Sequence, residues 1–137
     1  MNKVFCYVAV VSALVCLLSA CSKKMNFTRS VVMPTAEGGV KIKKDRNNNY
    51  AINVSVLHLA QPGKLQPPKQ TYVVWMETKE DGIKNIGQLK SSSGFLSKTL
   101  KASLSAITSF KPRRFFVTAE EAGDIQHPGL QTVLTTE

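Results

Sequence analysis

Few residues of this chain have the types and spacing that catalysis requires. Glu120, Glu121 and Asp124 form an acidic cluster, and paired carboxylates can act as general acid and base when burial separates their pKa values. Such a cluster can also bind calcium, but this one lacks the alternating oxygen ligands of a dedicated calcium loop. Neighbouring residues of a strand point to opposite faces, so Glu120 and Glu121 are not expected to act together. We predict no metal site, no cofactor and no catalytic residue, and keep a hydrolase that uses residues 120–124 as the alternative.

The histidines and serines offer no stronger site. His58 and His127 are far apart in the sequence, and neither has a cysteine partner for a catalytic pair or a zinc site. The segment Ser91–Gly94 lacks the flanking glycines and the following helix of a nucleophile elbow. We interpret the histidines as packed or surface side chains and the serine cluster as a turn.

Tyr72 and Trp75 are the aromatic residues that could contact a ligand or a partner. Both belong to Thr71–Thr78, a run that is apolar on both faces and therefore predicts a central strand. A tryptophan in such a strand usually fills the core of a β-sandwich. Core packing is our preferred interpretation of Trp75, with a ligand or partner groove as the alternative.

Cys21 ends a pattern that predicts covalent lipid attachment. Lys3 precedes the apolar run Val4–Ala20, which is too short to span a membrane and ends in small residues. The tetrapeptide Leu18-Ser19-Ala20-Cys21 resembles the lipobox of bacterial lipoproteins, in which the cysteine thiol receives a diacylglyceryl group before cleavage on its amino side. We expect residues 1–20 to be a signal peptide that is removed; a secretory signal cut elsewhere, or an uncleaved anchor, is the alternative.

The lipoprotein resemblance implies a place in the cell envelope. The lipid on Cys21 would hold the protein on a membrane, and Ser22 after the cysteine resembles the pattern of outer-membrane sorting. No acidic residue occurs in 22–26, which favours the periplasmic side over the cell surface. Another envelope protein is the expected partner.

The cysteine count and the charge agree with export. Cys6 and Cys16 leave with residues 1–20, so the remaining 117 residues hold one modified cysteine and no disulfide. The net charge of +9 falls to +8 because Lys3 is also removed. Export excludes nucleic acid as the expected partner, and no basic run is interleaved with stacking aromatics. Near the acylated end, Lys23, Lys24 and Arg29 could contact anionic headgroups.

The remaining sequence predicts one all-β domain after a short tether. Residues 21–29 lack periodicity and are assigned to the lipidated tether, and residues 30–137 to a single domain. Strands are predicted at 30–33, 39–43, 50–59, 71–78, 83–90, 115–118 and 131–136, with turns or loops at 45–49, 61–68, 80–82, 91–94 and 120–129. Residues 97–107 have apolar spacing that fits either a helix or a strand, and we favour a strand at about 97–103. Short strands separated by turns predict an antiparallel β-sandwich.

Four short motifs resemble the carboxy-terminal domain of anti-sigma-K factors. They are Tyr72-Val73-Val74-Trp75, Asn85–Leu89, Phe116–Gly123 and Pro128-Gly129, in the family's order and rough spacing. The resemblance implies an immunoglobulin-like sandwich of about seven strands outside the cytoplasm, over residues 30–136. We do not expect sigma-factor regulation, because the sequence predicts neither the family's amino-terminal zinc-binding helical segment nor its retained transmembrane helix.

These observations favour a binding or structural module over an enzyme. We expect a lipid-anchored, non-catalytic β-sandwich that contacts another envelope protein through a sheet face or an exposed edge. No small-molecule substrate is indicated.

Overall fold

The computed structural model describes residues 3–4, 21–92 and 100–137, and these residues form nine β-strands. The strands are β1 Ser22–Asn26, β2 Glu37–Lys44, β3 Tyr50–Leu57, β4 Thr71–Thr78, β5 Ile83–Gln88, β6 Lys90–Ser92, β7 Lys101–Thr108, β8 Pro112–Glu120 and β9 Thr132–Thr135. A 3₁₀ turn, η2 Pro62–Lys64, lies between β3 and β4. The all-β prediction is confirmed. The signal peptide stays a prediction, because residues 1–2 and 5–20 lie outside the described part.

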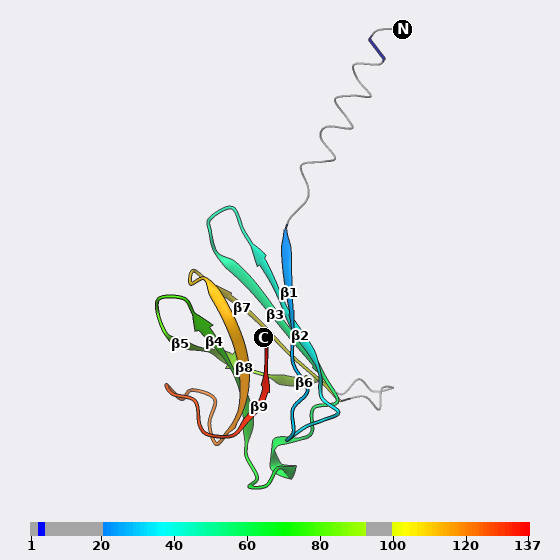
Figure 1. Cartoon of the computed structure of the whole chain (residues 1–137), viewed down its shortest axis with the longest axis vertical. Helices are drawn as coiled ribbons and strands as arrows, with labels where there is room; N and C mark the ends of the chain where they lie inside the picture. The colour runs from blue at the N-terminus through cyan, green and yellow to red at the C-terminus, as the bar shows by residue number, and fades with distance from the viewer. Residues whose placement is uncertain (1–2, 5–20, 93–99) are drawn as a thin grey trace.

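The strands form two antiparallel sheets that pack face to face (Figure 1). One sheet has the order β1-β2-β3-β7-β6 and the other has the order β5-β4-β8-β9. Without β1, the larger sheet has the A-B-E-D order of an immunoglobulin constant domain, and the smaller one has the order C′-C-F-G. The immunoglobulin-like sandwich is therefore confirmed, with nine described strands instead of about seven.

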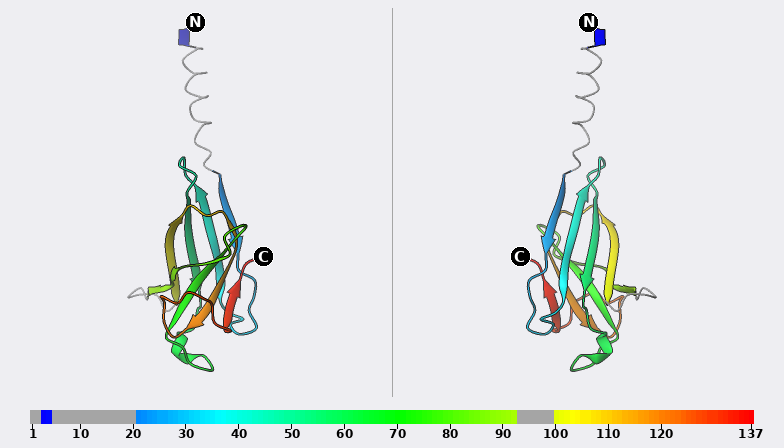
Figure 2. Two further views of the ribbon diagram at one scale, coloured as in Figure 1. Left: turned by 90° about the vertical axis from the view of Figure 1, so that its left-hand side faces the viewer. Right: turned by 90° about the vertical axis from the view of Figure 1, so that its right-hand side faces the viewer.

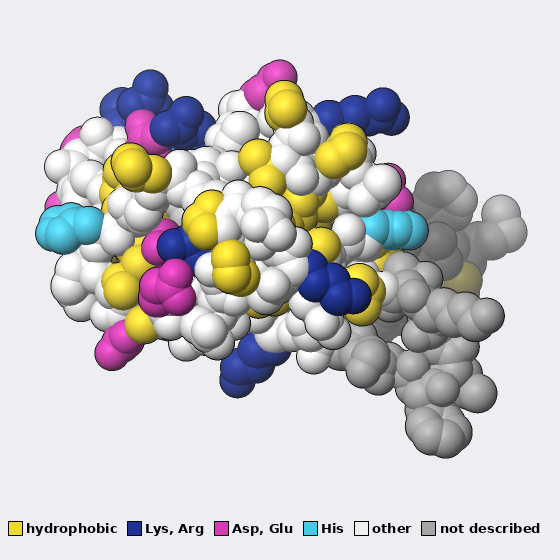
Figure 3. Space-filling model, turned by 90° about the horizontal axis from the view of Figure 1, so that it is seen from below, with side chains coloured by type: hydrophobic (Ala, Val, Ile, Leu, Met, Phe, Trp, Pro, Cys, Tyr) yellow, Lys and Arg dark blue, Asp and Glu magenta, His cyan; other side chains and the backbone are white. Residues whose placement is uncertain are grey.

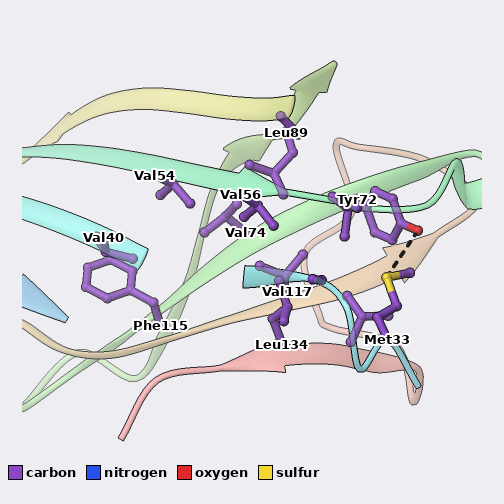
Figure 4. Packing of buried hydrophobic residues seen from close by; sticks show 14 of the residues in the cluster. Met33, Val40, Val54, Val56, Tyr72, Val74, Leu89, Phe115, Val117 and Leu134 are labelled. Atoms are coloured by element: carbon purple, nitrogen blue, oxygen red, sulfur yellow. Dashed lines mark hydrogen bonds between the residues drawn. The ribbon is translucent and has the colours of Figure 1, made fainter. Parts of the chain in front are cut away.

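Alternating side chains fill the space between the sheets. In β3, Ile52, Val54 and Val56 are buried while Asn53 and Ser55 are exposed, as the period of two predicts. Figure 4 shows side chains from both sheets meeting in this core, among them Val40, Val54, Val56, Val74, Phe115, Val117 and Leu134. The core contains no disulfide among the described residues, so hydrophobic packing provides the main cohesion between the sheets.

Backbone contacts also join the two sheets along one edge. Phe27, just after β1, forms an isolated bridge with Thr136, just after β9. The backbone N–H of Thr28 donates to the carbonyl of Thr135 at 2.8 Å. The first and last segments of the domain therefore fasten the larger sheet to the smaller one.

The predicted tether is wrong over most of its length. Residues 22–26 form β1, which pairs with β2 from Ser22 opposite Lys43 to Asn26 opposite Gly39. Met25 is the only buried residue of β1, so the sequence shows no apolar alternation there. An edge strand of this kind is held by backbone hydrogen bonds, which a hydrophobic pattern does not reveal. The folded domain therefore begins one residue after Cys21.

The strand predicted at 30–33 is also wrong. The Ser30 hydroxyl oxygen accepts hydrogen bonds from the backbone N–H groups of Val32 and Met33, at 3.1 and 3.3 Å. Such local side-chain bonds compete with strand pairing. Val31 is fully exposed, whereas Met33 turns into the core.

The strand predicted at 83–90 divides between the two sheets. β5 pairs with β4, as expected of a hairpin, but β6 pairs with β7 in the other sheet. Between them, Leu89 is buried and its backbone N–H donates to the carbonyl of Tyr72 at 3.0 Å. The predicted turn at 91–94 is wrong for Ser91 and Ser92, which belong to β6, and residues 93–94 lie outside the described part.

The ambiguous segment 97–107 is a strand where it is described. β7 begins at Lys101 and pairs with β3 along its whole length. Residues 97–99 lie outside the described residues. The strand interpretation is confirmed from 101 onward, and the helical alternative is wrong there.

The turn predicted at 45–49 is confirmed, and hydrogen bonds to the Asp45 side chain hold it. Asp45 Oδ1 accepts hydrogen bonds from the backbone N–H groups of Asn47 and Asn49, at 2.8 and 2.9 Å. Asn48 takes a left-handed conformation with φ of 64°. The backbone hydrogen bond from Asn49 holds the pKa of Asp45 below its usual value. The β2–β3 hairpin therefore closes through a local side-chain cap.

We expect truncation of Phe115 to test the core. Phe115 is fully buried, so Phe115→Ala should lower the free energy of unfolding by about 3 to 5 kcal/mol, measured by urea titration. Ile107→Ala is the matched control, because Ile107 is 77% exposed and its loss should change stability by less than about 0.5 kcal/mol. Equal effects of the two changes would contradict the described core.

Candidate functional site

Cys21 lies at the surface and leads directly into the larger sheet. Its side chain is exposed, and the next residue, Ser22, already pairs with Lys43. β1 starts at the upper end of the sandwich in Figure 1, opposite the end that carries η2. A group attached to this thiol would therefore sit beside one end of the sandwich.

Tyr72 is a core residue and does not line an open site. Its side chain is buried, and its hydroxyl donates to the carbonyl of Ala60 at 2.8 Å and lies 3.9 Å from Met33 Sδ (Figure 4). Burial raises the pKa of the Tyr72 hydroxyl far above its usual value, so the group stays protonated. Tyr72 thus fastens β4 to the segments after β1 and β3.

Trp75 is fully buried, but it lies outside the core between the sheets. It belongs to a second cluster with Val73 and Phe116, against which Ile125 packs. Its ring stacks on that of Phe116 with centroids 6.3 Å apart, and its Nε1–H donates to the Thr118 hydroxyl at 2.7 Å. The prediction that Trp75 packs is confirmed, whereas its place in the central core is wrong.

Tyr72 and Trp75 do not form a common site. They are three residues apart in one strand, so their side chains leave opposite faces of β4. Both are buried in the described structure. Neither aromatic ring is available to a ligand without local opening.

The carboxylate of Glu120 is buried on the same face as Trp75. Its Oε1 accepts a hydrogen bond from the Thr118 hydroxyl and one from the backbone N–H of Gly129 at 2.7 Å. The Trp75 indole donates to Thr118 in turn, so the four groups form a continuous hydrogen-bonded chain. A Cβ at position 129 would lie 2.6 Å from Glu120 Oε2, so this close approach requires glycine.

A further side chain holds the loop after β8 against the sheet. Asn85 of β5 donates through Nδ2 to the carbonyls of Gly123 and Ile125, both at 2.9 Å. Together with the contacts of Glu120, these bonds fix the two halves of the loop 121–131. We call this set, Asn85, Thr118, Glu120 and Gly129, the loop clasp.

The predicted acidic cluster is not brought together. Glu120 is buried, whereas Glu121 is exposed and pairs with Lys69 at 3.0 Å, as expected for neighbours in a strand. Asp124 is exposed in the loop. Within residues 3–4, 21–92 and 100–137, no three His, Cys, Asp or Glu side chains are grouped for metal binding, and His58 and His127 join no such group.

One surface depression lies at the end of the sandwich opposite Cys21. It has a volume of about 620 Å³ and is lined in part by Val32, Lys69, Glu120, Leu130 and Gln131. Val32 and Leu130 are exposed, and Figure 3 shows hydrophobic side chains across this end. Its charged groups are already engaged, Glu120 in the loop clasp and Lys69 with Glu121. It therefore presents an apolar rim with few unused polar groups.

A second depression, of about 640 Å³, lies on the outer face of the larger sheet. It is lined by polar and small residues, by one carboxylate and by two apolar side chains: Lys24, Asn26, Phe27, Glu37, Gly38, Gly39, Lys41, Asn53, Ser55 and Leu57. The right-hand view of Figure 2 shows this face, with β1, β2, β3 and β7 side by side. These residues could not be predicted to converge, because they come together only through β1, a strand that has no hydrophobic pattern.

Comparison with known proteins finds no matching family model, no similar curated protein and no similar solved structure. Among the described residues, no helix has the length and apolarity needed to cross a membrane.

The loop clasp predicts unequal roles for two adjacent glutamates. Glu120→Ala would leave the Thr118 hydroxyl and the Gly129 N–H without their buried acceptor, which should cost about 1 to 3 kcal/mol of stability. Glu121→Ala, the control, removes an exposed ion pair and should cost less than about 1 kcal/mol. Chemical denaturation measures both, and a larger loss for Glu121→Ala would contradict the clasp.

Trp75 is the only tryptophan, so its fluorescence reports directly on the outer cluster. We expect blue-shifted emission that resists iodide quenching, and a loss of about 3 to 5 kcal/mol in Trp75→Ala. Thr118→Val keeps the packing but removes the acceptor of the indole N–H, so a smaller loss of about 1 to 3 kcal/mol is expected. Red-shifted, readily quenched emission together with a stable Trp75→Ala protein would make Trp75 a ligand contact instead.

Proposed function

We propose that this chain is a lipid-anchored protein of the bacterial cell envelope whose β-sandwich is a non-catalytic binding module. The observation that carries the binding role is the outer face of the larger sheet, a polar and cationic surface with a depression that no described segment covers. Its edge strand begins one residue after the predicted lipid-bearing cysteine. A sheet face held at a membrane surface is suited to recognition of a partner in the envelope.

The position of Cys21 supports anchoring without a flexible spacer. Lys23, Lys43 and Lys44 are exposed near Cys21 at the same end of the sandwich. Basic side chains beside a lipid anchor add electrostatic attraction to an anionic leaflet, at about 1 kcal/mol for each. We place the protein at the outer membrane on the periplasmic side, on the pattern of residues after Cys21.

The acidic loop favours the module over the hydrolase alternative. A general acid and base must reach one substrate, yet Glu120 is enclosed by its hydrogen-bond donors while Glu121 points to solvent. Glu120 has a sufficient structural role in holding the loop clasp. We therefore assign residues 120–124 to folding.

The resemblance to anti-sigma-K factors is proposed to extend to the fold alone. Its motifs supply Tyr72, Trp75 and Glu120, and each of these makes packing or clasp contacts. Such residues preserve a fold and carry no information about a partner. Sigma-factor regulation forms no part of the proposed function.

The anchor is tested by metabolic labelling of the full chain in a bacterial host. Radiolabelled palmitate should enter the protein, and Cys21→Ala should abolish the label because the acceptor thiol is gone. Cys16→Ala is the matched control, since Cys16 lies within the segment expected to be removed, and it should be labelled normally. Equal labelling of the two variants would show that Cys21 is not the acceptor.

A further inference from the structure

Strand pairing arranges the outer face of the larger sheet into rows of like residues. In one row Lys24 lies opposite Lys41, and Lys41 lies opposite Asn53. The neighbouring row contains the small or amide side chains of Asn26, Gly39, Ser55 and Ser103 and ends at Lys90, which pairs with Ser103. The row beyond it contains Glu37, Leu57 and Lys101, so one carboxylate and one further lysine border the strip on that side. A polar strip thus crosses the strands between lysines.

A lysine on the edge strand β1 discourages pairing with another chain, but that role does not explain why Lys24 faces Lys41 of β2. Like charges directly opposite each other on adjacent strands are destabilising. Neither Lys24 nor Lys41 forms a salt bridge within the described part of the chain, where the ion pairs are those of Lys69, Arg113 and Arg114. An external anion would offset the repulsion between Lys24 and Lys41, which face each other without a salt-bridge partner among the described residues.

The strip has the shape of a site for an extended chain. The depression beside Lys24 and Lys41 is lined by Gly39 and Ser55, and at Gly39 the backbone of β1 leaves no room for a side chain. Adjacent strands are about 4.8 Å apart, so the four strands from β1 to β7 give the strip a length of about 14 Å. Asn53 and Ser105 continue the polar surface and are joined by a hydrogen bond of 2.8 Å.

We infer that this face binds an acidic polysaccharide of the envelope, with its carboxylate or phosphate groups on the lysines and its hydroxyl groups on the Asn and Ser side chains. This inference rests on the proposed function, because an envelope location brings such polymers within reach. Nucleic acid is disfavoured, because the one aromatic residue that lines the depression, Phe27, is partly buried against the core, and stacking on bases requires exposed rings. A lipid surface requires no amide and hydroxyl strip, so it is the weaker occupant.

The test measures binding of the full chain, expressed with residues 1–20 and purified in neutral detergent, to immobilised polygalacturonate and to uncharged dextran. Binding to polygalacturonate alone, weakened by salt, is expected. The double variant Lys24→Ser/Lys41→Ser should bind about tenfold more weakly. The matched control, Lys64→Ser/Lys79→Ser, removes two exposed lysines from other loops and should bind like the original chain.

Thermal unfolding of the same variants separates a binding role from a folding role. Removal of facing like charges should leave the Lys24→Ser/Lys41→Ser protein at least as stable as the control. Weaker binding with unchanged or higher stability supports the inference. Equal binding by both double variants, or no binding to polygalacturonate, overturns it.

A second measurement distinguishes the lipid surface. Lys41 should react equally with a water-soluble amine reagent when the chain is held in phosphatidylcholine vesicles with or without phosphatidylglycerol. Protection only with phosphatidylglycerol, together with no polygalacturonate binding, would assign the face to anionic lipid. Palmitate labelling is independent of the polygalacturonate and vesicle measurements. Absence of labelling would contradict the proposed anchor, whereas absence of polymer binding would contradict only the proposed ligand.

Discussion

The carboxylate of Glu120 must be hydrogen-bonded because it is buried, and this requirement organises one side of the sandwich. A carboxylate removed from water without donors would cost several kcal/mol, and here the Thr118 hydroxyl and the Gly129 N–H provide them. The same hydroxyl accepts from Trp75, so the position of the indole depends on the carboxylate. The loop after β8 lies over the smaller sheet as a result, and β4 becomes buried on both faces.

The larger sheet, unlike the smaller one, is buried on its inner face only. Its inner face meets the core, whereas its outer face stays open and carries lysines, amides and hydroxyls. The molecule therefore has one sheet covered by its own loop and another whose outer face is covered by no segment of the described residues. This asymmetry supports the proposal that the outer face of the larger sheet binds the partner.

Strands with an apolar pattern could be predicted from the sequence. Strands that are held mainly by backbone hydrogen bonds could not. β3 and β4 have clear apolar patterns, and their bounds were predicted within two residues. β1 has a single buried residue. β6 has only three residues, and it pairs with β7 in the larger sheet although the preceding strand, β5, belongs to the smaller one. No local sequence pattern therefore marks either strand. The same distinction applies to the residues of the candidate sites. Trp75 could be predicted as buried, but its placement outside the core depends on the loop clasp, and the facing lysines depend on the register of β1.

The edge position of β1 also has a mechanical consequence, given the proposed lipid on Cys21. Hydrogen bonds between antiparallel strands are perpendicular to the strands. Tension from the membrane enters at the Ser22 end of β1, while the other end is held to β9 through Phe27 and Thr28. A pull along β1 would therefore shear its bonds to β2 together instead of peeling them apart one at a time. An anchor at the proposed position would therefore load the bonds between β1 and β2 in parallel.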